Sequence, residues 1–211
     1  MADADPARPW HSGETVLADI QNLANPAEAP HTIRFSAAMA AIFQTQRRAS
    51  YPGGHSKEQG GTIVADGKGR LSIQNIGGLG STAGTFTPNL TANDPAHFTV
   101  VGVFHTHPYD RTEGSMPGVA FSGGDLGALV LTSTIISVVQ SGPRLFVFLK
   151  TALTPSWIDY NAVNNAANAE LAARVQAGQT FQQASRIIAR NRSLQYGLAY
   201  YQGGGGVATR V

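Results

Sequence analysis

The chain has no cysteine among its 211 residues. It therefore forms no disulfide bond and offers no thiolate ligand to a metal ion. The fold must depend on a hydrophobic core, which a hydrophobic content of 42% can supply. The length exceeds that of a typical single domain but is short for two complete enzymatic domains.

Charge and long apolar runs are also scarce. Charged residues make up 13% of the chain, the formal net charge is +2, and no basic block suggests nucleic acid as a partner. No run approaches the ~18 apolar residues of a membrane span, so no membrane association is expected. Residues 1–10 lack the basic and apolar parts of a secretory signal peptide. We therefore expect a cytoplasmic protein, or one secreted by a route without an N-terminal signal peptide.

Two neighbouring segments carry residues that commonly bind metals. Residues 100–108 read Val-Val-Gly-Val-Phe-His-Thr-His-Pro, and residues 122–125 read Ser-Gly-Gly-Asp. Residues i and i+2 of a strand share a face, so His105 and His107 at the end of an apolar strand can hold one ion together. Asp125 would supply the third ligand. Three protein ligands leave the fourth tetrahedral position of a zinc ion for water, as in catalytic rather than structural sites.

Each half of this pattern also has a simpler interpretation. Ser122 and Asp125 ahead of an apolar run form a capping box at a helix start. Two nearby histidines occur by chance or as satisfied polar groups. Their joint occurrence, between an apolar strand and a helix, favours the metal site. Two other families that use His-x-His fit less well, because the final His of the metallo-β-lactamase pattern is absent and barrel amidohydrolases place the motif near the start of a longer chain.

The pattern resembles that of the JAMM (JAB1/MPN/Mov34) family of zinc metallopeptidases, in which an upstream Glu precedes His-x-His-Pro and Ser-x-x-Asp. The resemblance covers residues 36–150, and Glu58 of Glu-Gln-Gly-Gly stands at the position of the upstream Glu. One departure concerns the spacer. Residues 109–121 form a longer spacer than is usual in the family, which indicates a loop inserted at the rim of the site.

The resemblance implies both a fold and a chemistry. The fold would be an α/β sandwich of the MPN/JAB-like (cytidine-deaminase-like) kind, with a central mixed β-sheet flanked by helices. His105, His107 and Asp125 would bind Zn²⁺. Glu58 would act as general base toward a metal-bound water, and Ser122 would hydrogen-bond that water or the developing oxyanion. The reaction would be hydrolysis of an amide or isopeptide bond.

The general base has other candidates in the sequence. Glu113 lies in the spacer, nearer the histidines, and Asp110 is nearer still. Acidic loop residues are commonly solvated, so Glu58 remains the preferred base. His55 can reach the rim of the site, although a surface position is the simpler expectation, as it is for His11, His31 and His97.

We expect three segments along the chain. Residues 1–30, rich in Ala, Pro and Asp, would be a flexible N-terminal lead. Residues 31–153 would be the metallopeptidase core. Residues 154–211 would be a helical extension of two helices broken near Gly178, ending in a Gly-rich tail at residues 203–206. Packing against the sheet is the simplest role for this extension, and a substrate arm or an autoinhibitory or docking segment is the alternative.

Local patterns predict the elements of the core. A helix with Met39, Ile42 and Phe43 on one face should begin near Ser36. The polar, Gly- and Thr-rich residues 77–94 should form a long loop near the substrate. The remaining predictions are a hairpin from residues 62–65 and 71–76, a strand at 98–104, a helix at 125–132, and strands at 135–139 and 145–149.

The composition favours a bacterial or phage protein. Lysine occurs three times against twelve arginines, which is typical of codon bias or of an effector that avoids lysine modification in a foreign cell. We therefore expect a secreted effector or toxin peptidase. Its partners would be a protein or peptide substrate, such as a ubiquitin-like protein or a cell-wall peptide, and an immunity or inhibitor protein. The alternatives are a non-catalytic MPN-type scaffold and a peptidoglycan- or phage-tail-directed peptidase.

Overall fold

A mixed β-sheet forms the centre of the protein in a computed structural model, which describes residues 13–50, 56–108 and 118–211. The strands of this sheet are β1 (Thr32–Arg34), β2 (Gly60–Asp66), β3 (Leu71–Gln74), β6 (Phe98–Thr106), β7 (Ile136–Ser141), β8 (Arg144–Leu149), β9 (Ala199–Gly204) and β10 (Val207–Arg210). Their order in the sheet is β1-β10-β9-β8-β7-β6-β2-β3. Only β6 and β7 pair in parallel, and the other neighbours are antiparallel.

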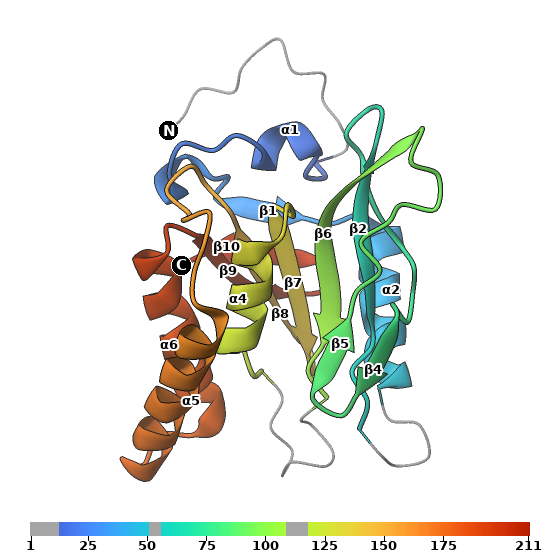
Figure 1. Ribbon diagram of the computed structural model, residues 1–211. Helices are drawn as coiled ribbons and strands as arrows, with labels where there is room; N and C mark the ends of the chain where they lie inside the picture. Colours follow the sequence, from blue (N-terminus) through green and yellow to red (C-terminus); the bar gives the residue numbers. More distant parts are fainter. Residues whose placement is uncertain (1–12, 51–55, 109–117) are drawn as a thin grey trace.

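Helices cover both faces of the sheet (Figure 1). They are α1 (Leu17–Ile20), the 3-10 helix η1 (Pro26–Glu28), α2 (Ala37–Ala49), α4 (Gly123–Leu131), α5 (Tyr160–Gln176) and α6 (Phe181–Gln195). Side chains alternate along each strand, so each face contributes its own hydrophobic core. On β8, Val147 packs into the core below α2, whereas Phe146 and Phe148 pack into the core below α4, α5 and α6. The predicted α/β sandwich is therefore confirmed as a general architecture.

The core elements with a strong local pattern form where the sequence predicted them. Helix α2 begins after Ser36, whose hydroxyl accepts a hydrogen bond from the backbone N–H of Met39 at 3.2 Å. The buried residues of α2 are Met39, Phe43 and Gln46, while Ile42 is half-buried at the edge of that face. The hairpin β2–β3, the strands β6, β7 and β8, and the helix α4 also match their predicted positions within a few residues.

The parallel pairing of β6 and β7 sets up the site. Two parallel neighbours need a crossover connection, and here α4 lies within that connection. The register pairs His105 with Val139 and Thr106 with Gln140. The carboxyl end of β6 is therefore fixed in the sheet, and the chain returns to begin α4 close to the end of β6.

The prediction of a flexible lead over residues 1–30 is wrong for residues 13–30, and residues 1–12 lie outside the described part. Ile20, Leu23 and Ala29 are buried in the core on the α2 side of the sheet. The carbonyls of residues 26, 27 and 29 accept hydrogen bonds from the Arg210 guanidinium. Sequence periodicity missed this segment because its apolar residues anchor short turns rather than a regular helix or strand.

The predicted Gly-rich tail is also wrong. The two helices of the extension and their break at Gly178 are confirmed, but residues 199–210 form a hairpin inside the central sheet. Strand β9 pairs with β8, and β10 pairs with β1. A Cβ on Gly203 would lie 2.6 Å from the Cα of Ala208, so glycine allows the two strands to pair closely here. Residues 154–211 therefore complete the sheet of residues 31–153 rather than standing outside it.

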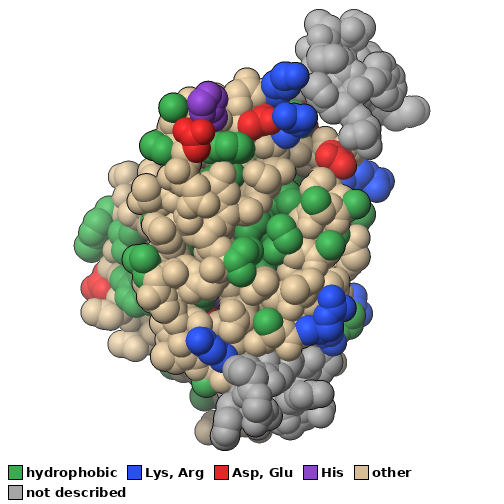
Figure 2. All heavy atoms as spheres, turned by 90° about the vertical axis from the view of Figure 1, so that its right-hand side faces the viewer, with side chains coloured by type: hydrophobic (Ala, Val, Ile, Leu, Met, Phe, Trp, Pro, Cys, Tyr) green, Lys and Arg blue, Asp and Glu red, His purple; other side chains and the backbone are tan. Residues whose placement is uncertain are grey.

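The predicted loop at residues 77–94 contains a two-stranded ribbon, β4 (Gly80–Thr82) and β5 (Thr85–Thr87). Figure 2 views the molecule from the side of β2, β3 and this ribbon, where charged side chains lie mainly toward the margins of the face and uncharged ones fill its middle. In the described part of the chain, none of the helices has the length and apolar character that crossing a membrane requires.

Candidate metal centre

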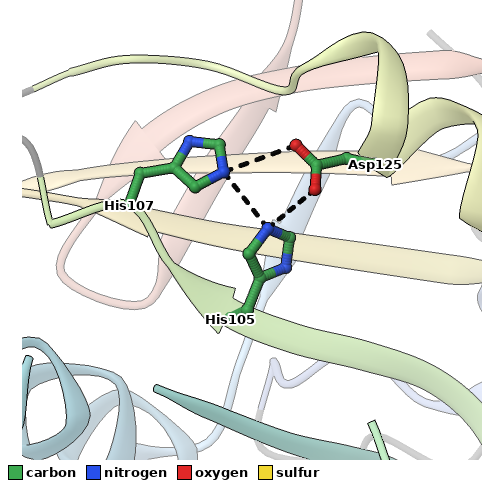
Figure 3. A group of neighbouring side chains, drawn as sticks. All are labelled: His105, His107 and Asp125. Carbon is green, nitrogen blue, oxygen red and sulfur yellow. Dashed lines mark hydrogen bonds and ion pairs between the residues drawn. The ribbon is translucent and has the colours of Figure 1, made fainter. Parts of the chain in front are cut away.

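His105, His107 and Asp125 point toward one another (Figure 3). His105 is near the end of β6, His107 follows that strand directly, and Asp125 lies in the first turn of α4. The Nε2 atom of His105 is 2.9 Å from Asp125 Oδ1, and that of His107 is 3.4 Å from Asp125 Oδ2. The two Nε2 atoms are 3.2 Å apart. Both imidazoles are buried, so the group lies inside the protein and not on an open surface.

This donor set fits a zinc ion. Zinc bonds of about 2.0–2.1 Å to nitrogen and oxygen give tetrahedron edges of about 3.3–3.4 Å. The two Nε2 atoms lie 3.2 Å apart, near that edge length, and the Asp125 carboxylate places Oδ1 2.9 Å from His105 Nε2 and Oδ2 3.4 Å from His107 Nε2. The Nδ1 atom of His107 is 3.3 Å from the carbonyl oxygen of Val119. A proton on Nδ1 would serve that carbonyl and leave the Nε2 lone pair for a metal.

The charges in this cluster are strongly coupled. Burial opposes ionisation of Asp125, but the charge of His105 and the hydrogen bonds from both histidines hold the pKa of this carboxyl well below its usual range. Burial also opposes protonation of His107, yet the hydrogen bond to Asp125 and the negative charge of Asp125 raise the pKa of that imidazole. A half-buried carboxylate with two buried imidazoles at contact distance is therefore a favourable environment for a positive charge.

Ser122 and Asp125 also form the capping box that was the simpler interpretation. The Ser122 hydroxyl accepts a hydrogen bond from the Asp125 backbone N–H at 3.1 Å and donates its proton to Asp125 Oδ2 at 2.8 Å. The Ser122 backbone N–H donates to the same oxygen at 2.7 Å. The helix cap and the metal-type cluster therefore share Asp125, because the hydrogen bonds of the cap orient its carboxylate toward the two histidines. In this arrangement the single hydroxyl proton of Ser122 is committed to Asp125.

Glu58 reaches the same pocket from the opposite strand. Gly60 pairs with His105, so continuing the antiparallel register by two residues places Glu58 opposite His107. The side chain of Glu58 is buried, with 5% of the residue exposed. Burial raises the pKa of this carboxyl, although the nearby charges of His105 and His107 counteract part of the effect. The structure therefore brings the predicted base together with the three predicted ligands.

Thr106 connects the two strands that carry these groups. Its side chain points away from the pocket, and its hydroxyl lies 2.7 Å from the Ser50 hydroxyl. The same hydroxyl accepts a hydrogen bond from the Gln59 backbone N–H at 2.9 Å, and the Gln59 carbonyl accepts one from the Thr106 backbone N–H at 2.8 Å. Because Ser50 donates to the Gln46 carbonyl of α2, this network fixes the segment bearing Glu58 to both α2 and β6.

The four predicted groups line a pocket of about 390 Å³, together with Ser122. The β4–β5 ribbon forms one wall, where the Phe86 ring lies parallel to the His105 imidazole with 6.3 Å between ring centroids. Helix α4 and the start of α5 form the opposite wall. Among the described residues that line the pocket there is no Lys or Arg, and the only His, Asp and Glu side chains there are the two histidines and the two carboxylates.

Other predicted residues fall outside this cluster. Asp110 and Glu113, the alternative bases, lie outside the described residues together with most of the predicted spacer loop, and so do His11 and His55. His31 and His97 are exposed, as predicted, and His97 forms an ion pair with Asp94 at 2.7 Å.

Sequence reasoning missed Phe86, Tyr160 and Asn164 as residues that line the pocket, and Thr106 as a residue that holds the Glu58 segment. Phe86 and Tyr160 reach the pocket through long-range packing, so no local pattern marks them. The one available signal is the run Gly123-Gly-Asp-Leu-Gly127, because glycines on one face of a helix allow a second helix to approach closely.

No protein-family model, curated protein or solved structure matches the chain. What the site can do must therefore be argued from its chemistry. A His-His-Asp cluster beside the buried carboxyl of Glu58 provides a place for a cation and a group that can exchange a proton.

Proposed function

We propose that this protein is a zinc-dependent metallopeptidase or isopeptidase of the JAMM type, with a core of the MPN/JAB-like kind. The observation that carries the proposal is the convergence of His105, His107 and Asp125, whose ligand atoms lie within 4.8 Å of one another, beside the buried Glu58. Two imidazoles and one carboxylate with an open fourth position are typical of catalytic zinc. The motif resemblance supports the same chemistry.

The roles of the side chains follow from their positions. When bound, zinc would supply Lewis acidity toward a water molecule and an amide carbonyl. His105 and His107 would hold the ion through Nε2, and Asp125 through its carboxylate. Glu58 would accept a proton from the attacking water and deliver it to the leaving amine nitrogen. A pKa raised by burial suits a carboxyl that must hold this proton between two transfers.

The proposed substrate is a protein or peptide, and the proposed setting is a bacterial effector or toxin domain with an inhibitor protein as partner. The low charge and the shortage of lysine support this setting. A non-catalytic scaffold of the same fold is the rival function. The burial of Glu58 speaks against a scaffold, because a buried carboxyl opposes folding and would serve no purpose there.

Metal analysis combined with peptide cleavage tests the proposal. We expect about one zinc per chain in the wild-type protein and in Glu58→Gln, and none in Asp125→Ala. His97→Ala, which removes an exposed histidine, should retain zinc. Glu58→Gln should cleave a mixture of unstructured peptides about 10²- to 10⁴-fold more slowly than the wild-type protein. Absence of zinc from the wild-type protein, or undiminished cleavage by Glu58→Gln, would contradict the proposal.

A further inference from the structure

Helix α5, from the C-terminal extension, contributes to the wall of the metal pocket. Tyr160 and Asn164 lie about one turn apart at its start and line the pocket. If Gly124 carried a Cβ, that atom would lie 3.0 Å from the Tyr160 hydroxyl, 3.5 Å from Ser122 Oγ and 3.7 Å from Asn164 Oδ1. Three polar groups therefore surround one point beside Asp125.

This position of α5 depends on glycines of α4. A Cβ on Gly127 would lie 2.5 Å from Cδ2 of Tyr160, and a Cβ on Gly123 would lie 2.8 Å from Cα of Asn164. Larger residues would force α5 away. The close approach lets the Tyr160 ring lie against Gly127, and it holds the Tyr160 hydroxyl at the pocket.

The polar groups of α5 can both donate and accept hydrogen bonds with a ligand, whereas the Ser122 hydroxyl has no proton left to donate. Ser122 donates its hydroxyl proton to Asp125. Within the described part of the chain, neither the Tyr160 hydroxyl nor the Asn164 side-chain amide forms a hydrogen bond. A few polar groups without protein partners in an otherwise apolar pocket are the usual means of orienting a ligand.

The charge of the pocket limits what binds there. The carboxylates of Glu58 and Asp125 face it, and no Lys or Arg of the described residues lines it. Apart from the proposed zinc ion, these walls offer no positive charge to an acidic side chain of a bound peptide. The hydrogen-bonding groups that a peptide presents to Tyr160 and Asn164 are therefore those of its backbone.

We propose that Tyr160 and Asn164 bind the backbone of the peptide substrate beside the scissile amide, which makes the C-terminal extension part of the substrate site. This inference rests on the proposed peptidase function. The Tyr160 hydroxyl donates to a substrate carbonyl. The Asn164 amide carries both a donor and an acceptor, which match the carbonyl and N–H of an extended peptide. The side chains of the bound segment that face these walls are uncharged or basic.

Chelating probes of different length separate metal binding from backbone binding. Acetohydroxamate binds zinc and carries no peptide. Two further hydroxamates each carry three alanines and a cap at the far end. In the first the alanines precede the chelating group, and in the second they follow it. Dissociation constants would be measured by calorimetry with the zinc-loaded wild-type protein, Tyr160→Phe, Asn164→Ala and the matched control Asn165→Ala. Tyr160→Phe keeps the ring against Gly127, and Asn165 is an exposed neighbour outside the pocket.

We expect at least one peptide hydroxamate to bind the wild-type protein more tightly than acetohydroxamate does. Tyr160→Phe and Asn164→Ala should each weaken that peptide hydroxamate by about threefold to tenfold, the effect of one hydrogen bond. Acetohydroxamate should bind all four proteins equally, and Asn165→Ala should behave as the wild-type protein does.

Two outcomes overturn the inference in distinguishable ways. In the first, acetohydroxamate binds, but the peptide hydroxamates bind all four proteins equally or bind the wild-type protein no more tightly than acetohydroxamate does. This result overturns the role of α5 and leaves the proposed function standing. Failure of the wild-type protein to bind zinc or acetohydroxamate overturns the proposed function, and the role of α5 with it.

Discussion

Two carboxyl groups of one pocket, Asp125 and Glu58, have opposite electrostatic environments. Hydrogen bonds and charge from His105 and His107 favour the ionised form of Asp125. Burial dominates at Glu58 and favours the neutral form. Pairs of carboxyl groups whose pKa values are pushed apart in this way often divide the tasks of binding and proton transfer. At the scale of the residue, the proposed metal ligand and the proposed base are therefore distinguished by their surroundings.

The raised pKa of Glu58 makes the stability of the metal-free protein depend on pH. A carboxyl whose folded-state pKa is raised favours folding below its unfolded pKa, and this contribution is lost as pH rises through the folded pKa. Glu58→Gln should therefore make the metal-free protein more stable than wild type at pH 7.5, and the difference should shrink at about pH 4. Urea unfolding in the presence of a chelator measures this. The exposed Glu14→Gln is the control, and a pH-independent difference would contradict the expectation.

Thr106 holds the Glu58 segment in place, so its hydroxyl should matter for both stability and hydrolysis. Thr106→Val removes the acceptor of the Gln59 N–H and the partner of the buried Ser50 hydroxyl. We expect a loss of about 1–3 kcal/mol in the free energy of unfolding, with zinc retained and peptide cleavage slowed. Denaturant unfolding and metal analysis measure these effects. Thr106→Ser keeps the hydroxyl and should restore both properties; a Thr106→Val protein as stable as Thr106→Ser would show that the network contributes nothing.

At the scale of elements, short-range patterns were sufficient for much of the fold and of the site. Strand β6 and helix α4 were predictable because an apolar run and a cap-forming Ser122 mark them locally. The three metal-type ligands were predictable because they lie on these two consecutive elements. Glu58 needed the family resemblance, since its place opposite His107 depends on the register of β2 against β6.

The remaining elements could not be predicted because their structure depends on distant partners. Strand β9 ends in glycines, which alone indicate a flexible tail, and it becomes a strand by pairing with β8 and β10. Tyr160 reaches the pocket only because α5 packs on α4, and neither helix sequence specifies the other as partner. Residues 13–30 pack through isolated apolar side chains that have no periodicity.

The contact between α4 and α5 leads to a prediction about Gly123. A Cβ there would lie 2.8 Å from both Cα of Asn164 and Cβ of Ala167, and a backbone cannot move aside locally. Gly123→Ala should therefore cost about 1–3 kcal/mol in the free energy of unfolding. Gly67→Ala, at a position with open space, is the matched control. Thermal unfolding compares the two, and equal melting temperatures would mean that the helices can separate without loss.

At the scale of the whole molecule, the last hairpin joins the two ends of the described chain. Strand β10 lies between β9 and β1, pairing Thr32 with Thr209, and Tyr201 donates a hydrogen bond to the Pro30 carbonyl at 2.8 Å. The residues of β9 alternate between the two hydrophobic cores, with Tyr200 on one side and Tyr201 on the other. The hairpin is therefore shared by both faces of the sandwich.

A chain that ends at residue 198 should consequently fail to fold. Loss of the β9–β10 hairpin would expose β8 as an edge strand and remove Tyr200 and Tyr201 from the two cores. We expect no cooperative thermal transition and increased binding of a hydrophobic dye. A cooperative melt of the shortened protein would instead show that the rest of the chain folds without this hairpin.

The pairing of β1 with β10 also bears on the order of events in folding. Contacts between residues far apart in sequence form slowly because long loops must close first. The hairpins β2–β3 and β7–β8 and the crossover through α4 involve much shorter loops. We expect the cluster at the end of β6 to assemble early, while β1 and β10 still lack their partners, so the proposed metal ion would act as a template during folding.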